Sequence, residues 1–494
     1  MRALTAIALA CFAATAAAER APDLVLRGEL TGKDHHTYRE APFDVPKGTS
    51  RITIDVDYTG RDERTTIDLG LLGPGGFVEQ DGFRGWSGGN KHRFTVSATD
   101  ATPSYLPGAI EPGRWRLELG IPNIRPSSKS TYTAKVWFSR DDEGFGPERG
   151  LTEQPLDTRD RWYRGDLHMH SVHSDGGCLN ASGTKKVPCP LFLTVDNASK
   201  RGLDFVALSE HNTMSQVSEM RAMQPYFDTM LLIPAREITT FEGHANLFGV
   251  SAPIDFRLGT KDVPDWNALL AAVAKAHGVI SINHPMRPND ETCMGCGFTP
   301  ASPVDMRGFQ AIEAVNGTDT GRKDSGIPFW EKQLDAGLRI TAIGGSDSHD
   351  GSKPGVGTPT TVVHARELSI EGILDGIRAG HVFVDIEGTR ERMLEVRARA
   401  GAQEAEMGDA LAVARGEPVH VEVRTVALSG QKMVVTVDGR RVEPPGKDVI
   451  GAGGSQSFDW TGDGKAHWLR VDVRDAQGHL LVLGNPVYVN RQGF

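Results

Sequence analysis

The sequence predicts an α/β protein in which a closed βα-barrel is flanked by an N-terminal β-sandwich and a smaller C-terminal β-sandwich. Three observations support this fold class. Polar and apolar residues alternate with period two in residues 23–140 and again in residues 393–494, as half-buried strands require. Between these regions, residues 162–385 alternate short apolar runs with helical patterns. About 225 residues of such units suit a barrel better than an open sheet.

The N-terminus has the features of a secretory signal peptide over residues 1–18. A positive charge at Arg2 precedes a short apolar run, which ends in small residues at Ala18, before Glu19. We therefore expect an exported mature protein, either periplasmic or secreted. The N-terminal β-sandwich is expected over residues 19–155, with turns at clusters of glycine and proline such as residues 73–76. The polar stretch 141–160 is the expected linker.

The barrel is expected over residues 156–388. Helical spacing predicts helices at residues 266–277, 329–336 and 370–379, and Gly278 is the expected end of the first. Because strands and helices alternate, we expect parallel βα units. The apolar runs that predict the barrel strands are residues 204–208, 230–233, 245–248, 279–282, 311–315 and 340–343. The smaller C-terminal β-sandwich is expected to follow the barrel, over residues 389–494.

Composition and charge argue against two classes of function. The chain of 494 residues carries 64 acidic and 54 basic side chains, for a net charge of −10. This composition provides no cationic face for nucleic acid. After the signal peptide, no stretch reaches the ~18 apolar residues that a membrane span needs, so we expect no transmembrane anchor. Nothing in the sequence predicts an oligomeric state.

Four cysteines remain after the signal peptide, in a compartment that permits disulfides. Three pairings are possible. The preferred one joins Cys178 to Cys189 and Cys293 to Cys296, because it closes two short loops. The residues around the second pair are typical of a loop, which favours a structural disulfide over a redox centre. A zinc site of four cysteines is the weaker alternative, since the first pair lacks the usual spacing.

Histidines and carboxylates gather at the ends of the apolar runs. In a βα-barrel these ends surround one mouth, where side chains from different strands converge. Residues two apart in a strand share a face, so His168 with His170, and Asp347 with His349, should each form a chelating pair. Imidazole and carboxylate suit zinc, manganese or iron, and a carboxylate such as Glu237 can bridge two ions. The predicted metal ligands are His168, His170, Asp175, His211, Glu237, His244, His284, Asp347 and His349.

The other histidines and one acid receive different interpretations. Asp166 shares the strand face of His168 and is expected to orient it. His173 is expected to be a loop or rim residue, although it could compete with Asp175 for an ion. His277 is expected to cap the C-terminus of a helix. No partner pattern accompanies the remaining histidines, which we interpret as structural or solvent-facing: His35, His36, His92, His364, His381, His420, His467 and His479.

Four motifs resemble those of the polymerase-and-histidinol-phosphatase (PHP) family of metallohydrolases, in its exported branch related to carbaryl hydrolases. They are residues 166–176, 209–213, 283–285 and 344–349. The resemblance implies a distorted seven-stranded βα-barrel with two or three divalent ions. It places His168, His170, Glu237 and Asp347 around a first ion. Glu237 would bridge to a second ion held by His284 and possibly His244, and Asp175, His211 and His349 would surround a third. One departure is Glu210, where many relatives carry aspartate, and it bears on the third site.

The resemblance implies a hydrolase that uses a metal-bound hydroxide to cleave phosphate esters of small molecules, with Glu237, Asp347 and His349 as catalytic residues. The expected substrate contacts are Arg287, Asn316, Arg322 and Lys323. Hydrolysis of a carbamate or carboxylic ester is an alternative, because Phe298 lies near Arg287 in the sequence and an apolar mouth would suit such substrates. A non-catalytic metal-binding or glycan-binding protein is the second alternative.

Overall fold

A computed structural model describes residues 20–77, 82–89, 91–140, 152, 154–290, 293, 295–318, 320–321, 323–353, 355–442 and 448–491. The predicted signal peptide and most of the first half of the predicted linker lie outside these residues. The chain divides into two compact units. The first comprises the chain up to residue 95 together with residues 110–138, and the second comprises residues 96–109 and 139–494.

The first unit consists of two antiparallel sheets of four strands each. The burial of β2 alternates toward its end, with Ala41, Phe43 and Val45 buried and their neighbours exposed, as its sequence pattern predicts. One sheet has the order β1 (Leu24–Thr31), β8 (Lys129–Ser139), β3 (Arg51–Tyr58), β6 (Arg93–Ser97). The other has the order β2 (Thr37–Val45), β7 (Gly113–Asn123), β4 (Thr66–Leu72), β5 (Phe83–Ser87).

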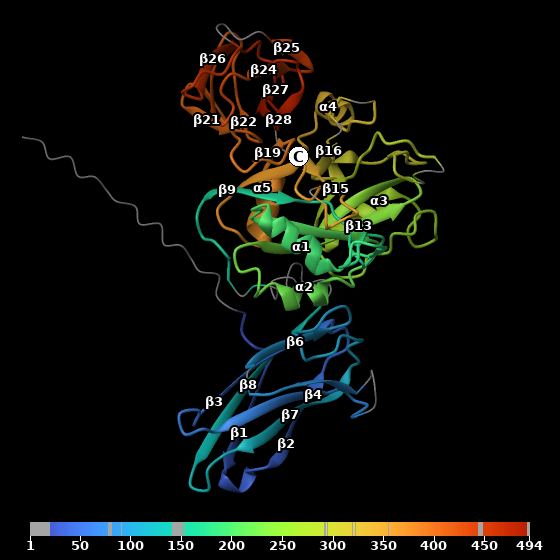
Figure 1. Ribbon diagram of the computed structural model, residues 1–494, viewed down its shortest axis with the longest axis vertical. Coiled ribbons are helices and arrows are strands. Elements are labelled where there is room, and N and C mark those ends of the chain that lie inside the picture. The colour runs from blue at the N-terminus through green and yellow to red at the C-terminus, as the bar shows by residue number, and fades with distance from the viewer. Residues whose placement is uncertain are drawn as a thin grey trace, which may run out of the picture. The chain divides into compact units, whose positions relative to one another are not determined.

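The second unit is built on a large mixed sheet of fifteen strands (Figure 1). Its central strands curve so that β17 meets β18: the Thr361 hydroxyl accepts from the Gly344 N–H at 2.8 Å and donates to the Gly344 carbonyl at 2.6 Å. The central strands, in sheet order, are β17 (Thr341–Gly345), β16 (Ala311–Asn316), β15 (Val279–Ile282), β14 (Gly243–Phe248), β13 (Leu231–Thr240), β12 (Phe205–His211), β9 (Arg161–Asp166), β18 (Thr360–Ala365) and β19 (Val382–Asp385).

The expectation of parallel βα units throughout is wrong at β14 and at β18. Strand β18 runs antiparallel to β9 and β19, and β14 runs antiparallel to β13 and β15. Only Phe241 and Glu242 separate β13 from β14. Two residues suffice for a hairpin, whereas a parallel crossover needs a dozen or more. The pairs β9–β12, β12–β13, β15–β16 and β16–β17 are parallel.

Helices pack around these strands (Figure 1). In α5 the buried residues Ile370, Ile373, Leu374 and Ile377 follow helical spacing, and Gly380 ends the helix with a φ of 78°. The expected end of α3 at Gly278 is wrong, because the helix ends at Lys275 and the left-handed residue is one position before that glycine. The helices are α1 (Leu191–Lys200), α2 (Val217–Met223), α3 (Trp266–Lys275), α4 (Ile327–Asp335) and α5 (Ile370–Ala379), with short 3-10 turns at Gly32–Asp34 and Met306–Gly308.

The C-terminal strands form two layers, and one of these layers continues the central sheet. Strand β28 (Leu480–Gly484) pairs with β19 and leads on to β27 (His467–Arg474), β24 (Lys432–Val437) and β25 (Arg440–Val442), with β29 (Val487–Val489) and β22 (Ala410–Leu411) beside them. The other layer has the order β21 (Gln403–Glu406), β20 (Met393–Ala400), β23 (Pro418–Val426), β26 (Ser455–Thr461). Phe383 of β19 belongs to the core between them.

None of the helices in the described part of the chain combines the length and the apolar character needed to cross a bilayer.

Candidate metal centre

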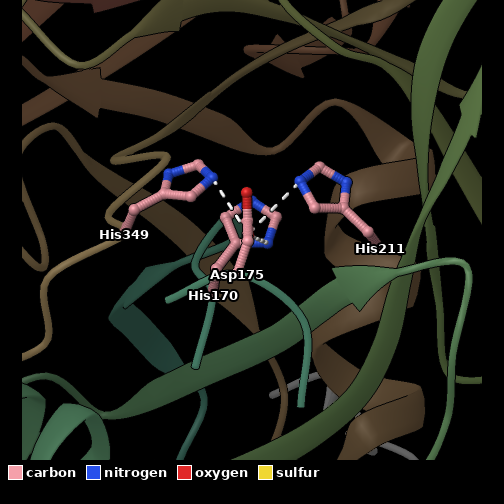
Figure 2. A group of neighbouring side chains, drawn as sticks. All are labelled: His170, Asp175, His211 and His349. Atoms are coloured by element: carbon pink, nitrogen blue, oxygen red, sulfur yellow. Dashed lines mark ion pairs between the residues drawn. The ribbon is translucent and has the colours of Figure 1, made fainter. Parts of the chain in front are cut away.

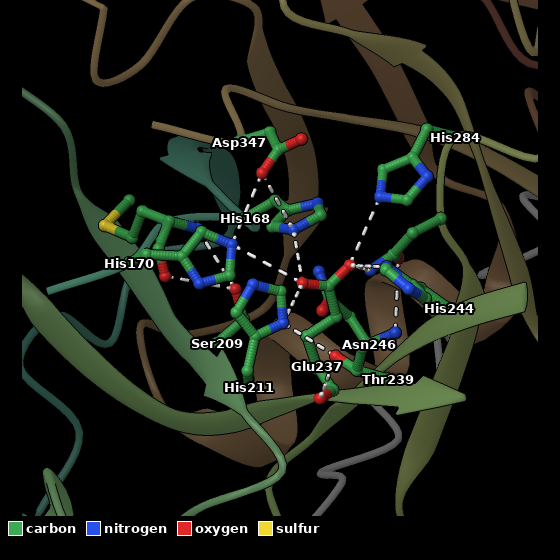
Figure 3. Close-up of polar contacts among 12 residues, drawn as sticks. His168, His170, Ser209, His211, Glu237, Thr239, His244, Asn246, His284 and Asp347 are labelled. Carbon is green, nitrogen blue, oxygen red and sulfur yellow. Dashed lines mark hydrogen bonds and ion pairs between the residues drawn. The ribbon is translucent and has the colours of Figure 1, made fainter. Parts of the chain in front are cut away.

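Most of the predicted ligands converge at one place (Figure 3). His168, His284 and Asp347 follow the ends of β9, β15 and β17, His211 is the last residue of β12, and Glu237 and His244 lie within β13 and β14. Strand β9 ends at Asp166, and the chain continues beside the segment that follows β17. A parallel bridge joins Met169 to Ser348, and the N–H of His170 donates to the Ser348 carbonyl at 2.9 Å. The two segments therefore lie side by side, and they bring His168 and His170 into the same cluster as Asp347.

The first group of ligands is His168, His170, Glu237 and Asp347. Nε2 of His168 lies 3.3 Å from Oε2 of Glu237 and 3.4 Å from Oδ1 of Asp347. Nε2 of His170 lies 3.5 Å and 3.3 Å from the same two oxygens. Four ligands at about 2.0–2.1 Å from a tetrahedral ion stand about 3.3 Å apart. The four atoms therefore surround a position of the right size for one cation.

Several buried atoms of this cluster make no hydrogen bond with the described residues. They are Nε2 of His168, His170 and His244, and Oε2 of Glu237. Buried polar atoms are nearly always paired, because leaving them unpaired loses the solvation that water provides. Nε2 of His168 and Nε2 of His170 both face Oε2 of Glu237, and this convergence of three unpaired ligand atoms fits a divalent cation.

The second group lies on the other oxygen of Glu237. Its Oε1 is 3.2 Å from Nε2 of His284 and 3.2 Å from Nδ1 of His244, and it accepts a hydrogen bond of 2.9 Å from Asn283. His168, Glu237 and His284 together bring one ligand atom each within 4.8 Å. The two oxygens of one carboxylate thus face two groups, which is the arrangement of a bridging ligand.

The third group combines His170, Asp175, His211 and His349 (Figure 2). Oδ1 of Asp175 lies 3.3 Å from Nε2 of His349, 3.6 Å from Nε2 of His211 and 4.0 Å from Nδ1 of His170. The Asp175 side chain is 57% exposed, whereas the residues of the first group are nearly buried. The third group is therefore the part of the cluster that is open to solvent.

Asp347 and His349 do not chelate one ion as the strand period predicted. Asp347 joins the first group and His349 joins the third. The reason is local: β17 ends at Gly345, and Asp347 adopts a left-handed backbone with a φ of 50°. His284 likewise follows its strand with a φ of 25°. Such conformations are unfavourable for residues with a Cβ and concentrate at functional sites.

Burial and charge oppose each other in this cluster. Burial raises the pKa of the Glu237 carboxyl, but the neighbouring His168, His211 and His244 outweigh it and hold that pKa well below its usual range. At His170 burial, together with the neighbouring His168 and His349, outweighs Asp347 and Glu237, and the pKa of the imidazole is lowered. The cluster therefore presents an ionised carboxylate at its centre.

The third group contains a pair of residues with opposite pKa shifts. Burial disfavours the charged form of His349, yet Asp175 and Asp347 beside it raise its pKa to about 9. The hydrogen bond with His349 lowers the pKa of Asp175 to about 2. Without an ion, the two side chains form an ion pair at neutral pH.

Sequence reasoning did not identify Glu313 as a site residue. Its Oε1 lies 2.9 Å from Nδ1 of His168, and its Oε2 accepts from the N–H of His284 at 3.0 Å. A carboxylate on Nδ1 leaves Nε2 of His168 free to face the cation position. The available signal was a single acid in the middle of the apolar run 311–315. Asn283, which donates to Glu237, was also missed as a site residue, although it begins the motif 283–285.

Three of the predicted neighbours are not in the ligand groups. Asp166 accepts hydrogen bonds from the backbone of His168 (3.2 Å), Ser346 (3.0 Å) and Gly357 (2.7 Å), and so ties two ligand-bearing segments together. His173 contacts Ser215 at 2.8 Å and Glu219 at 3.0 Å, at the rim. The third neighbour, Glu210, accepts hydrogen bonds from Ser171 and Ser174 and so holds the loop that carries Asp175.

Two of the four predicted substrate contacts border the cluster. Nη1 of Arg287 lies 3.4 Å from Oδ2 of Asp347, and its Nη2 donates to Asn316. Asn316 in turn donates to Asp347 at 3.3 Å. Lys323 is exposed, and Arg322 lies outside the described residues.

Phe298, the apolar candidate, packs among aromatic rings rather than beside the ligands. Its ring contacts those of Trp266, Phe309 and Phe329, with centroids 5.4 to 5.9 Å apart.

Both local cysteine pairs are disulfide-bonded. Cys178 lies in β10 (Gly177–Leu179), and Cys189 follows β11 (Lys186–Pro188), the partner strand of a small hairpin. The N–H of Cys189 donates to the Gly176 carbonyl at 2.8 Å. The first disulfide therefore supports the loop that carries Asp175.

Comparisons with known proteins give only distant likenesses to solved structures. No family model matches the chain, and no curated protein matches it. A solved structure from Bacteroides vulgatus ATCC 8482, described as a two-domain protein containing a predicted PHP-like metal-dependent phosphoesterase, has 16% sequence identity and a TM-score of 0.36. The match covers 67% of this chain and 96% of that chain. A likeness this distant does not establish a common fold.

Proposed function

We propose that this chain is a metal-dependent hydrolase of the PHP type, with a distorted seven-stranded βα-barrel, that cleaves phosphate esters of small molecules. The observation that supports it most strongly is the set of three buried atoms without hydrogen bonds that face one another, Nε2 of His168, Nε2 of His170 and Oε2 of Glu237. Imidazole nitrogens and carboxylate oxygens of this kind hold zinc, manganese or iron.

The three groups of side chains would hold two or three such ions. His168, His170, Glu237 and Asp347 would hold the first, and Glu237 with His284 and His244 the second. A divalent cation supplies a Lewis acid that lowers the pKa of water toward neutrality and offsets the negative charge of the reacting ester. The third group, with His349, would hold the most exposed ion.

The residues around the ligands have separate tasks in this proposal. Glu313 fixes His168 so that Nε2 faces the first position. His349 donates from Nδ1 to the Asp347 carbonyl at 2.9 Å, which leaves its Nε2 directed at the third group. Glu237 and Asp347 provide the anionic ligands, and their burial keeps bulk water from competing for the site.

Arg287 is the feature that favours a phosphate ester over a carbamate. Its guanidinium lies beside Asp347 and Asn316, at the border of the ligand cluster. A guanidinium binds the oxygens of a phosphate in a bidentate manner, whereas a neutral carbamate offers no charge to match it. The aromatic ring expected for the carbamate alternative, Phe298, is occupied in packing against other rings.

The test is metal analysis of the protein purified without chelator, with parallel assays on p-nitrophenyl phosphate, bis-p-nitrophenyl phosphate and 1-naphthyl N-methylcarbamate. We expect two or three equivalents of metal and release of nitrophenol from a phosphate ester. Asp347→Ala should lose metal and activity together. Turnover of the carbamate alone would replace this proposal with the carbamate alternative. Bound metal without turnover of any of the three would favour a non-catalytic metal-binding protein.

Arg287→Ala separates substrate binding from metal binding. We expect its metal content to equal that of the wild type, while kcat/KM for the phosphate ester falls about 10- to 100-fold, the effect of losing a hydrogen bond to a charged group. Lys275→Ala, which removes an exposed cation at the end of α3, is the control and should change neither. Equal losses in both variants would contradict a specific role for Arg287.

Export through residues 1–18 is also part of the proposal and rests on the sequence alone. N-terminal sequencing of the chain recovered from the periplasm or medium tests it, with Glu19 expected as the first residue.

A further inference from the structure

A second cluster of imidazole and carboxylate side chains lies outside the groups described above. His364 is in β18, and His381 immediately precedes β19. These strands are antiparallel neighbours, and the N–H of His364 donates to the His381 carbonyl at 2.9 Å. Glu406 is the last residue of β21, in the other C-terminal sheet. The sequence pattern gave no partner to either histidine, because the three residues come from separate segments.

The distances in this cluster are long for hydrogen bonds and match those between ligands of one ion. Nδ1 of His364 and Nδ1 of His381 each lie 3.4 Å from the same oxygen, Oε1 of Glu406. An N–H···O hydrogen bond is most often about 2.9–3.0 Å long. Ligand atoms at about 2.0–2.1 Å from a tetrahedral ion are about 3.3 Å apart. All three residues offer one ligand atom within 4.8 Å of the others.

The opposite nitrogen of each ring binds a separate carboxylate. Nε2 of His364 lies 2.8 Å from Oδ1 of Asp160, and Nε2 of His381 lies 3.1 Å from Oδ1 of Asp409. A carboxylate at this position holds the proton on Nε2 and directs the lone pair of Nδ1 outward, as in most protein sites where histidine binds a metal. The lone pairs on Nδ1 of His364 and His381 then face the negative Glu406 carboxylate. A cation bound between the two nitrogens and the carboxylate would remove the electrostatic repulsion among them.

The cluster is accessible to ions from solution. The side chains of His364, His381 and Glu406 are 27%, 23% and 28% exposed. A cavity of about 240 Å³ adjoins His364 and Glu406, with Trp162 and Asp160 also in its lining. Three protein ligands and an accessible surface leave a fourth position for water.

We propose that His364, His381 and Glu406 bind one divalent cation of the zinc class, with Asp160 and Asp409 orienting the two rings. Two imidazoles and one carboxylate favour zinc over magnesium or calcium, which prefer oxygen ligands alone. The ion would link β18 and β19 of the central sheet to β21 of the other sheet. It shares no residue with the proposed active site, so the two proposals stand or fall separately.

The first test is calorimetric titration of the chelator-treated full-length protein with zinc chloride. We expect His381→Ala to bind one equivalent less than the wild type. Asp347→Ala should lose binding at the proposed active site and still show the equivalent that depends on His381. The matched control is His420→Ala, an exposed histidine that pairs only with Asp459, at 2.8 Å, among the residues of the described chain. Equal zinc stoichiometry in the wild type and His381→Ala would overturn the proposal.

A second variant removes any ambiguity from misfolding. Asp409→Asn keeps the size of the side chain and leaves all three ligands in place. We expect its zinc affinity at this site to fall about 10- to 100-fold, the usual effect of removing a carboxylate that orients a ligating histidine. A merely electrostatic surface cluster would not show this change. Wild-type affinity in Asp409→Asn, with an unchanged thermal melt, would also overturn the proposal.

Discussion

At the scale of single residues, the proton on one ring nitrogen decides which nitrogen of a histidine can face an ion. Glu313 makes this decision for His168, because it contacts Nδ1 at 2.9 Å from the middle of β16. The predicted ligands could be found from their place after apolar runs. Glu313 could not be assigned a role in this way, since its partner is 145 positions away in the chain.

We expect Glu313→Gln to weaken metal binding at the first group about 10- to 100-fold, because the amide holds the ring orientation of His168 less firmly than the carboxylate does. Metal titration of the variant measures this. Glu404→Gln, which changes an exposed carboxylate on β21, is the control and should bind as the wild type does. Unchanged affinity in Glu313→Gln would show that His168 is held by its surroundings alone.

The opposite pKa shifts of Asp175 and His349 predict how the stability of the metal-free protein depends on pH. The raised pKa of His349, from 6.5 to about 9, gives stabilisation that is complete below 6.5 and is lost as pH rises through 9. The lowered pKa of Asp175, from 3.8 to about 2, gives stabilisation that is present above 3.8 and is lost as pH falls through 2. The pair therefore stabilises the fold most between pH 3.8 and 6.5.

Thermal melting of Asp175→Asn against the wild type, both treated with chelator, tests this window. The difference in Tm should be largest between pH 3.8 and 6.5 and should disappear above about pH 9. Asp375→Asn breaks an exposed pair with Arg378 that contains no histidine, so its difference should stay constant across that range. A difference for Asp175→Asn that grows with pH would contradict the assigned shifts.

At the scale of elements, the sequence predicted the strands better than their directions. The apolar runs at 205–208 and 279–282 lie inside β12 and β15, because a buried strand needs apolar residues on both faces. The direction of β14 depended on a turn of two residues, which the apolar pattern does not show. The segments after β9 and β17 also escaped prediction, since their left-handed and bridging conformations arise from contacts between the two segments.

The disulfide between Cys178 and Cys189 should stabilise the hairpin beside the third group. It joins residues 11 positions apart, and the chain-entropy model gives about 3 kcal/mol for a loop of this length. The Cys293–Cys296 pair, with a separation of 3, should contribute about 2 kcal/mol by the same model. Chemical denaturation of the two double alanine variants compares them. A larger loss for the shorter loop would contradict the entropic account.

At the scale of the whole molecule, the chain has two compact units, and every proposed ligand lies in the second. The sequence predicted β-rich regions at both ends. It could not show that residues 96–109 cluster with the second unit, where the buried Asp100 accepts a hydrogen bond of 2.7 Å from Arg221. Nor could alternation reveal that β28 pairs with β19, because the pattern of a strand does not specify its partner.

Calorimetric unfolding should therefore show two transitions, of which one responds to metal. Ions bound only to the folded second unit stabilise it by about 3 kcal/mol when free metal is about 100 times Kd. Zinc or manganese should raise that transition and leave the other in place. The Asp347→Ala variant is the control, and metal should raise the unfolding temperature of its second unit by less than in the wild type. A single transition, or equal shifts of both, would show that the units do not unfold independently.

The pairing of β19 with β28 has a consequence for engineering the chain. Without the C-terminal strands, β19 would become an edge strand, hydrogen-bonded to β18 on one side and presenting free backbone N–H and C=O groups on the other. Such edges recruit strands from other molecules and promote aggregation. A truncation after residue 388 would thus leave every proposed active-site ligand in place, and we expect it to aggregate, because the C-terminal strands would no longer cover the edge of β19.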